Sequence, residues 1–310
     1  MTMFVLDVFS SPTLDIINGR LCRGGPAYYA RLALYAVGAS DARVRLPYDT
    51  CIDVEWYLRT EWCLEADTLA AIPECATVFM LEERDAGRRL KPLSLHKIGR
   101  EHPKGTAALI SPVLAELDID NAVRLLSHYS LAVLDVQGFS RLYYGGEVAV
   151  FSENVLALVE RVGVADNFIA IKASLEDIPD FIALDRLLRY SSSLGHTAIM
   201  VTAGPRGALI LYSDYSFVIR PRSVDRVPTG AGDMFSTLVL YGVWRGYGLE
   251  RSTLGAAAAV SCILERRDEI AYGGYGLCRD SFEERFHASI YRLPGRCYSI
   301  DCVISALEYG

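Results

Sequence analysis

The 310-residue sequence predicts a single α/β domain whose mostly parallel central sheet is covered by helices. Short runs rich in β-branched residues alternate with longer segments of helical periodicity, as in α/β proteins. Several runs are apolar at nearly every position, such as LAVLDV at 131–136 and FIAIK at 168–172, which is typical of strands buried on both faces. No linker rich in Pro, Gly or Ser divides the chain, so we expect one domain over residues 1–310.

The elements follow from these runs in chain order. The expected strands are Met3–Phe9, Thr77–Glu82, Thr106–Ile110, Leu131–Val136, Phe168–Lys172 and Ala198–Thr202. The expected helices between them are Pro26–Val37, Asp120–His128, Glu153–Val162 and Phe181–Ser193. Apolar runs at 208–212 and 216–219 flank Ser-Asp-Tyr and predict a hairpin. The segments 231–244 and 250–264 are apolar nearly all round and predict two buried helices.

The stretch from residue 41 to residue 104 is the least regular part of the chain. It mixes charges of both signs with several prolines. We expect a small lid over the edge of the sheet, with elements taken from residues 10–24 and 41–104.

The net charge of −7 and the pI of about 5.4 argue against a nucleic-acid partner and against a membrane surface, because both require a basic face. The longest small-apolar stretch, 254–264, is too short to span a bilayer, which takes about 20 residues. The N-terminal MTMFVLDVFS has no basic region and reads as a first strand, not a signal peptide. We therefore expect a cytoplasmic protein whose partners are small molecules.

The eight cysteines form no C-x-x-C pair and no Cys/His cluster of zinc spacing. We favour free or buried thiols. Disulfides are the minority interpretation, because they are rare in cytosolic proteins, with those of hyperthermophiles as the known exception. Cys297 and Cys302 are the closest pair in the sequence.

The segment PTGAGD, at residues 228–233, stands directly before one of the buried helices. Gly230 and Gly232 let the backbone turn tightly and approach a ligand. The first helical turn then presents free N–H groups and a positive dipole end, which suits phosphate. Asp233 lies in that turn, where a carboxylate can accept the proton of an attacking hydroxyl. A lone G-x-G-D is more often a plain capped turn, so the prediction depends on its context.

That context includes a second glycine turn, RGGPA at residues 23–27, before the first expected helix. Gly24 and Gly25 again permit close approach of the backbone to a ligand. Asp15 lies upstream, just after the first strand, where a carboxylate can bind the hydroxyls of a polyol. Taken singly, these are an ordinary turn and a surface aspartate.

Together, GGPAYYA near the start and PTGAGDMF near residue 230 closely resemble the two signature regions of the ribokinase-like (PfkB) carbohydrate kinases. Their order and separation fit the family, and TAGPRG at 202–207 is similar to its T-x-G-x-x-G turn. The resemblance covers roughly residues 4–266. A narrower resemblance, to the myo-inositol kinase branch, is carried by SPVL at 111–114 and DVQGF at 135–139.

The resemblance implies a Rossmann-like α/β/α sandwich with ATP and substrate at the carboxyl ends of the strands, where open α/β sheets bind ligands. It implies an ATP- and Mg²⁺-dependent kinase that phosphorylates a hydroxyl of a small polyol, sugar or nucleoside. Asp233 matches the catalytic base, and Gly230, Ala231 and Gly232 match the anion hole. The substrate-side candidates are Asp15, Gly24, Gly25, Tyr28 and Gln137, and the nucleotide-side candidates are Lys172, Ser174, Thr202, Gly204, Gly207, Thr229 and Ala258, with Ala257 on the same helix.

The chain departs from the family pattern before the catalytic aspartate. Val227 stands where an Asp is common, six residues before Asp233, and Asp225 is out of register. The cation or loop-ordering role of that position is therefore not implied here. Tyr28 stands where a substrate-contacting Asn is common, so substrate preference does not transfer from ribokinases proper.

The metal-organising N-x-x-E segment of the family corresponds to SLED at 174–177. Ser174 replaces the Asn and Asp177 replaces the Glu. We expect Asp177 and Glu176 to act on Mg²⁺ through water, because Mg²⁺ usually keeps several waters. Lys172 is close enough in sequence to reach a phosphate, and an exposed lysine at a strand end is an equal alternative.

Two other functions stay open. One is a nucleoside kinase of the same family. The other is a non-catalytic homologue that binds a polyol or nucleotide, an interpretation favoured by Val227, Ser174 and Tyr28 and opposed by the intact GAGD segment. The exact substrate, a requirement for a monovalent cation and a homodimer through an exposed lid sheet are also open.

Overall fold

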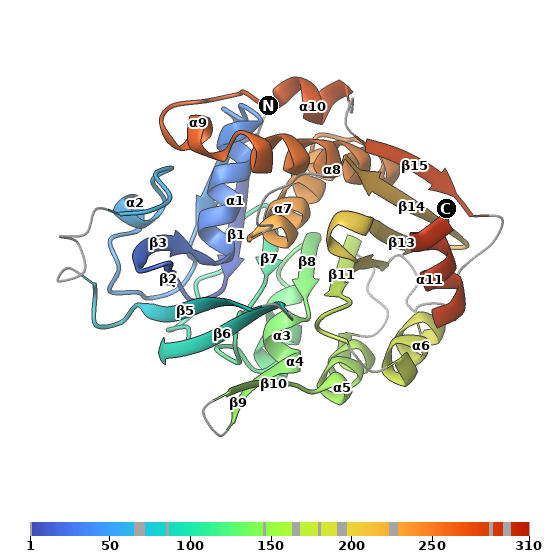
Figure 1. Cartoon of the computed structure of the whole chain (residues 1–310), viewed down its shortest axis with the longest axis horizontal. Coiled ribbons are helices and arrows are strands. Elements are labelled where there is room, and N and C mark those ends of the chain that lie inside the picture. Colours follow the sequence, from blue (N-terminus) through green and yellow to red (C-terminus); the bar gives the residue numbers. More distant parts are fainter. Residues whose placement is uncertain are drawn as a thin grey trace.

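The apolar runs form a nine-stranded central sheet in the order β15-β14-β13-β12-β11-β8-β7-β1-β4 (Figure 1). The structure is a computed structural model, and it describes residues 2–64, 72–84, 87–144, 147–162, 168–178, 181–190, 197–222, 229–284, 288–293 and 299–309. The strands of the sheet are β1 (Phe4–Phe9), β4 (Ala42–Arg45), β7 (Ala107–Ile110), β8 (Leu131–Asp135), β11 (Phe168–Ser174), β12 (Ala198–Thr202), β13 (Ala208–Tyr212), β14 (Tyr215–Pro221) and β15 (Ala288–Arg292).

Neighbouring strands from β4 to β12 run parallel, and β13, β14 and β15 are added antiparallel at the far edge. The described side chains of β7, β8 and β12 are buried at nearly every position, as their continuous apolar runs predict. The expected hairpin is β13 paired with β14. The predicted α/β class and mostly parallel sheet are therefore confirmed.

Helices cover both faces of this sheet and create two hydrophobic cores. One core contains residues of α1 (Gly25–Ala36), α7 (Ala231–Trp244) and α8 (Leu249–Glu265). The other contains residues of α3 (Ile119–Leu126), α5 (Ser152–Val162), α6 (Phe181–Tyr190) and α11 (Ile300–Tyr309). Helices α7 and α8 are buried along most of their length, which explains why both read as apolar all round.

A second sheet of four strands lies to one side of the first, in the order β3-β2-β5-β6 (Figure 1). Its strands are β2 (Thr13–Ile17), β3 (Arg20–Gly24), β5 (Thr77–Arg84) and β6 (Gly87–Ser94). They fall within the two ranges from which we expect the lid elements. Strand β5 contains the predicted strand Thr77–Glu82 and joins this second sheet. Periodicity identifies a strand but not the sheet that it enters.

Several short elements had no clear periodic signal. They are α2 (Val54–Tyr57), α4 (Gln137–Ser140), the hairpin of β9 (Arg141–Tyr144) and β10 (Glu147–Val150), the 3-10 helix η3 (Gly204–Arg206), α9 (Arg267–Ala271) and α10 (Arg279–Glu284). Within the described ranges, no helix is both long and apolar enough to cross a membrane.

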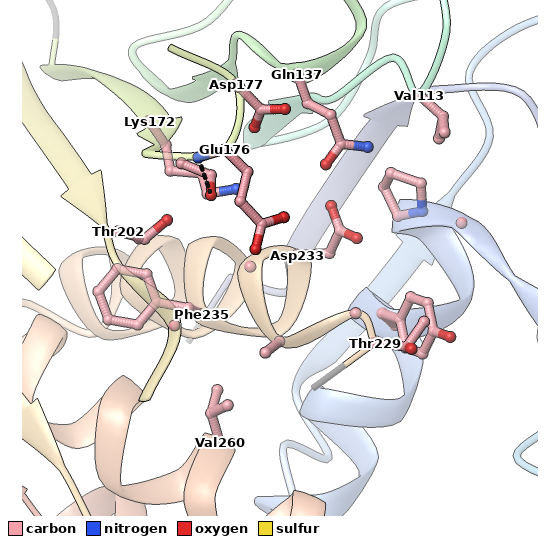
Figure 2. A pocket seen from close by; sticks show the side chains of 18 of the residues that line it. Val113, Gln137, Lys172, Glu176, Asp177, Thr202, Thr229, Asp233, Phe235 and Val260 are labelled. Atoms are coloured by element: carbon pink, nitrogen blue, oxygen red, sulfur yellow. Dashed lines mark hydrogen bonds between the residues drawn. The ribbon is translucent and has the colours of Figure 1, made fainter. Parts of the chain in front are cut away.

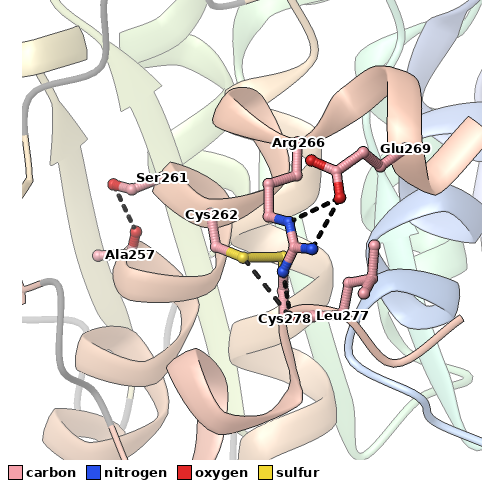
Figure 3. Close-up of a disulfide and its surroundings, with 7 residues drawn as sticks. All are labelled: Ala257, Ser261, Cys262, Arg266, Glu269, Leu277 and Cys278. Atoms are coloured by element: carbon pink, nitrogen blue, oxygen red, sulfur yellow. Dashed lines mark hydrogen bonds and ion pairs between the residues drawn. A yellow bond between two sulfur atoms is a disulfide. The ribbon is translucent and has the colours of Figure 1, made fainter. Parts of the chain in front are cut away.

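Disulfides overturn the expectation of free thiols. Cys22 bonds Cys63, Cys51 bonds Cys75, Cys262 bonds Cys278, and Cys302 is also disulfide-bonded. Cys297 lies outside the described residues. The three pairs are 16 to 41 residues apart in sequence, so only the tertiary fold brings the partners together. Figure 3 shows the bond from Cys262, which ties α8 to the segment that precedes α10.

Candidate active site

A cavity of about 1030 Å³ opens where Ser174 ends β11 and Thr202 ends β12. This is the edge of an open α/β sheet where ligands are expected. Figure 2 shows that Asp233, Gln137, Glu176 and Asp177 project into the same space from different elements. Most of the predicted site residues line the cavity: Asp15, Gly25, Gln137, Lys172, Ser174, Glu176, Asp177, Thr202, Gly204, Gly207, Thr229, Gly230, Ala231, Gly232 and Asp233.

The GAGD segment forms the turn that begins α7. Gly230 is the N-cap residue and has a left-handed backbone with φ of 79°. A Cβ atom there would collide with the ring of Tyr29, so both conformation and space require glycine. No side chain caps the helix, and the amides of its first turn have no intrahelical acceptor. The turn therefore offers free N–H groups and the positive end of α7 to an anion in the cavity.

Asp233 lies in this first turn, at the bottom of the cavity. The Ser111 hydroxyl donates a hydrogen bond of 3.0 Å to its Oδ1 atom. Burial raises the pKa of Asp233 to about 7, and the negative charge of Asp135 contributes in the same direction. The positive charge of Lys172 and the bond from Ser111 lower that pKa and limit the rise. Such a carboxyl group exchanges its proton near neutral pH, as a general base must.

Lys172 is buried beside this carboxylate. Its Nζ atom lies 2.7 Å from Oδ2 of Asp135, and both side chains are at most 4% exposed. Burial disfavours the charged amine, but Asp135, Asp177 and Asp233 raise the pKa of Lys172 above its ordinary value. A Cβ atom at Gly232 would lie 2.6 Å from Nζ, so the ammonium group directly adjoins the glycine turn. The alternative of a solvent-exposed lysine at the strand end is wrong.

A second ion pair stands next to the first. Nη2 of Arg141 lies 2.7 Å from Oδ1 of Asp177, whose side chain is fully buried. Burial raises the pKa of Asp177, although Arg141 opposes the rise. Glu176 is exposed, and its backbone N–H donates to the Ser174 hydroxyl at 3.4 Å. The described residues contain no group of three or more side chains arranged to hold a metal ion directly.

At the end of the cavity beside β2, the paired glycines make room for polar side chains of that strand. A Cβ atom at Gly24 would collide with the Asp15 carboxylate, and one at Gly25 would lie 2.7 Å from the Thr13 hydroxyl. Gly25 also has a positive φ of 78°. Gly24 therefore does not line the cavity but allows Asp15 to do so.

The two tyrosines of GGPAYYA point in different directions. Tyr28 does not line the cavity, because its hydroxyl donates to the Thr60 carbonyl at 3.0 Å within the core. Tyr29 lines the cavity, and its hydroxyl has no hydrogen-bond partner in the described part of the chain. The structure therefore corrects the prediction that Tyr28 contacts the substrate, because its neighbour Tyr29 is the tyrosine that lines the cavity.

Apolar side chains cover the same end of the cavity. They come from the second sheet, from the loop after β7 and from β10: Phe79, Leu81, Leu90, Val113, Val148 and Val150. A bound molecule would therefore contact hydroxyl and carboxylate groups on one side and a hydrocarbon surface on the other.

The opposite end of the cavity is formed by the turn after β12 and by α8. Gly207 has φ of 104°, and a Cβ atom there would collide with the Ile219 carbonyl, so this turn also requires glycine. Ala257 and Val260 line the cavity from one face of α8, three residues apart. Ala258 is fully buried and does not line it, which corrects the prediction for that residue. Val227 and Asp225 lie outside the described residues.

The residues that sequence reasoning missed include Ser111, Asp135, Arg141 and Tyr29. Ser111 follows β7 and Asp135 ends β8, so each is a polar residue at the carboxyl end of a buried strand. A polar residue at that position could have been predicted to lie at the ligand-binding edge of the sheet. Arg141 begins an edge hairpin, and nothing in the sequence around it indicates its bond to Asp177.

No protein-family model matches the chain, and no curated protein matches it either. Solved structures do match. A sulfate complex of a pyrophosphate-dependent kinase in the ribokinase family has a TM-score of 0.60 at 17% identity, covering 87% of this chain and 99% of that chain. A complex of such a kinase with a pyrophosphate analogue and myo-inositol has a TM-score of 0.56 at 18% identity, covering 87% and 99%.

Ribokinase from Cryptococcus neoformans var. grubii serotype A, in complex with ADP, has a TM-score of 0.57 at 12% identity, covering 92% of this chain and 100% of that chain. These similarities span nearly the whole of each structure. The chain has the ribokinase-like fold, as its two glycine motifs predicted.

Proposed function

We propose that this protein is a small-molecule kinase that transfers a phosphoryl group from ATP to a hydroxyl of a polyol or sugar. The observation that supports this most is the position of Asp233. Its carboxyl group, with a pKa of about 7, adjoins the free amides that begin α7 and the ammonium group of Lys172, all in one cavity. A proton acceptor next to an anion site is what phosphoryl transfer to an alcohol requires.

In the proposed mechanism, Asp15 and Gln137 bind hydroxyls of the acceptor and orient one of them toward Asp233. Asp233 accepts the proton of this hydroxyl as the hydroxyl oxygen attacks the terminal phosphorus of the donor, whose bond to the bridging oxygen breaks so that ADP leaves. The amides of Gly230 to Asp233 and the charge of Lys172 stabilise the negative charge that spreads over the phosphoryl oxygens. Because these groups are fixed before the donor binds, the protein does not have to reorganise during the reaction.

Mg²⁺ bound to the donor phosphates would neutralise part of their charge. The carboxylates of Glu176 and Asp177 line this part of the cavity, yet one is exposed and the other is paired with Arg141. This donor set fits an ion that keeps its water shell better than one caged by side chains, as Mg²⁺ commonly does. Glu176 and Asp177 would therefore hold the waters of the ion.

The acceptor we propose is a cyclic polyol such as myo-inositol, or a sugar. The polar side chains of Thr13, Asp15 and Gln137 suit several hydroxyls, and the apolar cover suits the C–H face of a ring. One structural neighbour is a kinase complexed with myo-inositol, which supports the same class.

Pyrophosphate is the second candidate for the phosphoryl donor, because three of the neighbouring structures are of pyrophosphate-dependent kinases. Lys172 and Arg141 already place two positive charges in the cavity. We favour ATP because the cavity continues to an apolar wall of Phe235, Ala257 and Val260, which offers a surface for a base.

The test combines each donor, ATP·Mg²⁺ or pyrophosphate·Mg²⁺, with a panel of cyclitols, pentoses, hexoses and nucleosides. The phosphorylated product is detected by mass spectrometry, and Asp233→Asn is the control. A product from ATP that disappears in the variant would support the proposal. A product from pyrophosphate alone would correct the donor, a nucleoside product would correct the acceptor, and no product from any pair would overturn the proposed activity.

A further inference from the structure

Arg267, the first residue of α9, is a buried cation behind the glycine turn. It is 6% exposed, and no described carboxylate lies within ion-pair distance of it. Its Nη2 atom donates a hydrogen bond of 2.7 Å to the carbonyl oxygen of Thr229, while its Nε atom is buried without a partner in the described part of the chain. Buried charges are usually paired with an opposite charge, so this arrangement requires an explanation.

Two aromatic rings hold the guanidinium group in place. Its central carbon lies 4.7 Å from the ring centre of Trp62 and 5.8 Å from that of Tyr29. Trp62 precedes Cys63, whose disulfide ties this segment to β3. Tyr29 packs directly against Gly230. Arg267 therefore connects the acceptor side of the cavity with the turn that begins α7.

The bond to Thr229 determines how that turn presents its first amide. The carbonyl of Thr229 and the N–H of Gly230 belong to one planar peptide group, and no peptide bond in the described ranges is cis. In a trans peptide the oxygen and the hydrogen point to opposite sides. A guanidinium group that fixes the oxygen therefore also fixes the direction of the N–H. A charge-assisted bond to the oxygen further polarises the peptide and strengthens its N–H as a donor.

We propose that Arg267 is a positioning residue for phosphoryl transfer, which orients and polarises the Thr229–Gly230 peptide so that its N–H stabilises the transferring group. The inference rests on the proposed function only in naming the anion as a phosphoryl group. Arg267 itself contacts neither donor nor acceptor in this account, since it acts from behind the turn and is not among the residues that line the cavity.

Arg267→Met and Arg267→Lys test this role, with Arg266→Met as the matched control. Arg266 is the residue directly before Arg267, but its guanidinium group bonds Glu269 at the surface (Figure 3). Loss of one donor in an oxyanion hole lowers kcat about 100-fold or more, so loss of a group that only orients such a donor should lower it about 10-fold. We expect that effect in Arg267→Met with little change in the acceptor KM, a smaller effect in Arg267→Lys, and none in Arg266→Met.

Chemical rescue separates positioning from mere packing. Guanidinium ion at millimolar concentration should restore part of kcat in Arg267→Ala, whose short side chain leaves room for the ion, and leave Arg266→Met unchanged. A folded Arg267→Met protein with wild-type kcat would overturn the proposal, and so would a loss of kcat in Arg267→Ala that guanidinium does not relieve. If Arg267→Met does not fold, Arg267→Lys decides: wild-type kcat overturns the proposal, and reduced kcat at an unchanged melting temperature supports it.

A failure of the proposed kinase activity can be distinguished from a failure of the proposed role of Arg267. If the wild type phosphorylates no acceptor, calorimetric titration with ATP·Mg²⁺ and with pyrophosphate·Mg²⁺ still measures the anion site. Weaker binding of either anion to Arg267→Met than to Arg266→Met would support the role of Arg267 without the kinase activity. Equal binding would overturn it.

Discussion

The two ends of the cavity differ in whether backbone groups or side chains form most of their lining. At the proposed donor end, the lining includes the backbone of the turn before α7 and of the turn after β12, where Gly230 and Gly207 have positive φ angles. At the proposed acceptor end, the lining consists mainly of side chains of β2, β5, β6 and β10. A backbone site needs glycine at fixed spacings and so leaves a motif in the sequence. A side-chain site can be made from many residue types and leaves none.

Because of this difference, we expect one end of the cavity to determine the rate of phosphoryl transfer and the other to determine which acceptor is used. The amides at the start of α7 are the same whatever acceptor is bound, and Asp233 adjoins them directly. The acceptor cover consists of replaceable side chains such as Phe79 and Val113. Substitutions at the donor end should therefore lower kcat for every acceptor, whereas substitutions in the cover should change which acceptor is used.

The largest expected effect belongs to Asp233→Asn. Asn keeps the size of the side chain and can still accept the bond from Ser111, but it cannot accept a proton. General-base catalysis contributes about 10²- to 10⁴-fold, so kcat should fall by that factor. Steady-state kinetics and calorimetric binding of ATP·Mg²⁺ check this together. Donor affinity that falls as far as kcat would show that Asp233 serves binding instead.

Lys172→Met should have the next largest effect, because it removes the charge beside the glycine turn and leaves Asp135 buried without its partner. Breaking a buried ion pair on one side lowers the free energy of unfolding by about 3–5 kcal/mol. Donor binding should weaken as well. Chemical denaturation and donor titration measure the two losses.

The double variant Lys172→Met/Asp135→Asn separates those losses. Removing the unpaired carboxylate should recover much of the stability, whereas donor affinity should stay low because the positive charge is still missing. Recovery of both would mean that Lys172 has only a structural role.

Asp15→Asn tests the proposed acceptor end of the cavity separately from the donor end. A hydrogen bond to a charged group contributes about 1.5–3 kcal/mol, so the acceptor KM should rise roughly 10- to 100-fold. The donor KM should stay nearly unchanged, since Asp15 lies on β2 at the other end of the cavity. Equal changes in both KM values would argue against two separate subsites.

The smallest effect on catalysis is expected from Cys262→Ser/Cys278→Ser. This disulfide joins residues 16 apart, and a loop of that length stabilises a fold by about 3 kcal/mol. Thermal unfolding should reveal the loss, while kcat at moderate temperature should stay near that of the wild type. A large fall in kcat would show that the bond also holds Ala257 and Val260 in place for the donor.

The fold and the donor end were predictable because both depend on local rules. Buried parallel strands are apolar throughout, and an anion turn requires its glycines, so β8, β11 and the GAGD turn could be identified from the sequence. The second sheet was only partly predictable. The runs of β2 (TLDII) and β3 (RLCRG) are interrupted by charged residues, and β6 mixes charged and apolar residues without alternation.

The remaining site residues depend on contacts between distant parts of the chain. Arg141 meets Asp177 across 36 positions, and Ser111 meets Asp233 across 122. Cys22 meets Cys63 in the same way, which is why the cysteines read as free thiols. Local pattern contains no information about such pairs, since each partner is compatible with many surroundings.

The most direct test of Asp233 as the base is the pH dependence of kcat/KM, which reports the ionisation of the free enzyme. The base works deprotonated, and burial raises its pKa to about 7, so kcat/KM should rise with pH and reach half its maximum near pH 7. Ser111→Ala removes a bond that lowers this pKa and should move the midpoint to higher pH. A midpoint near the ordinary aspartate value, or one that Ser111→Ala leaves in place, would contradict the account.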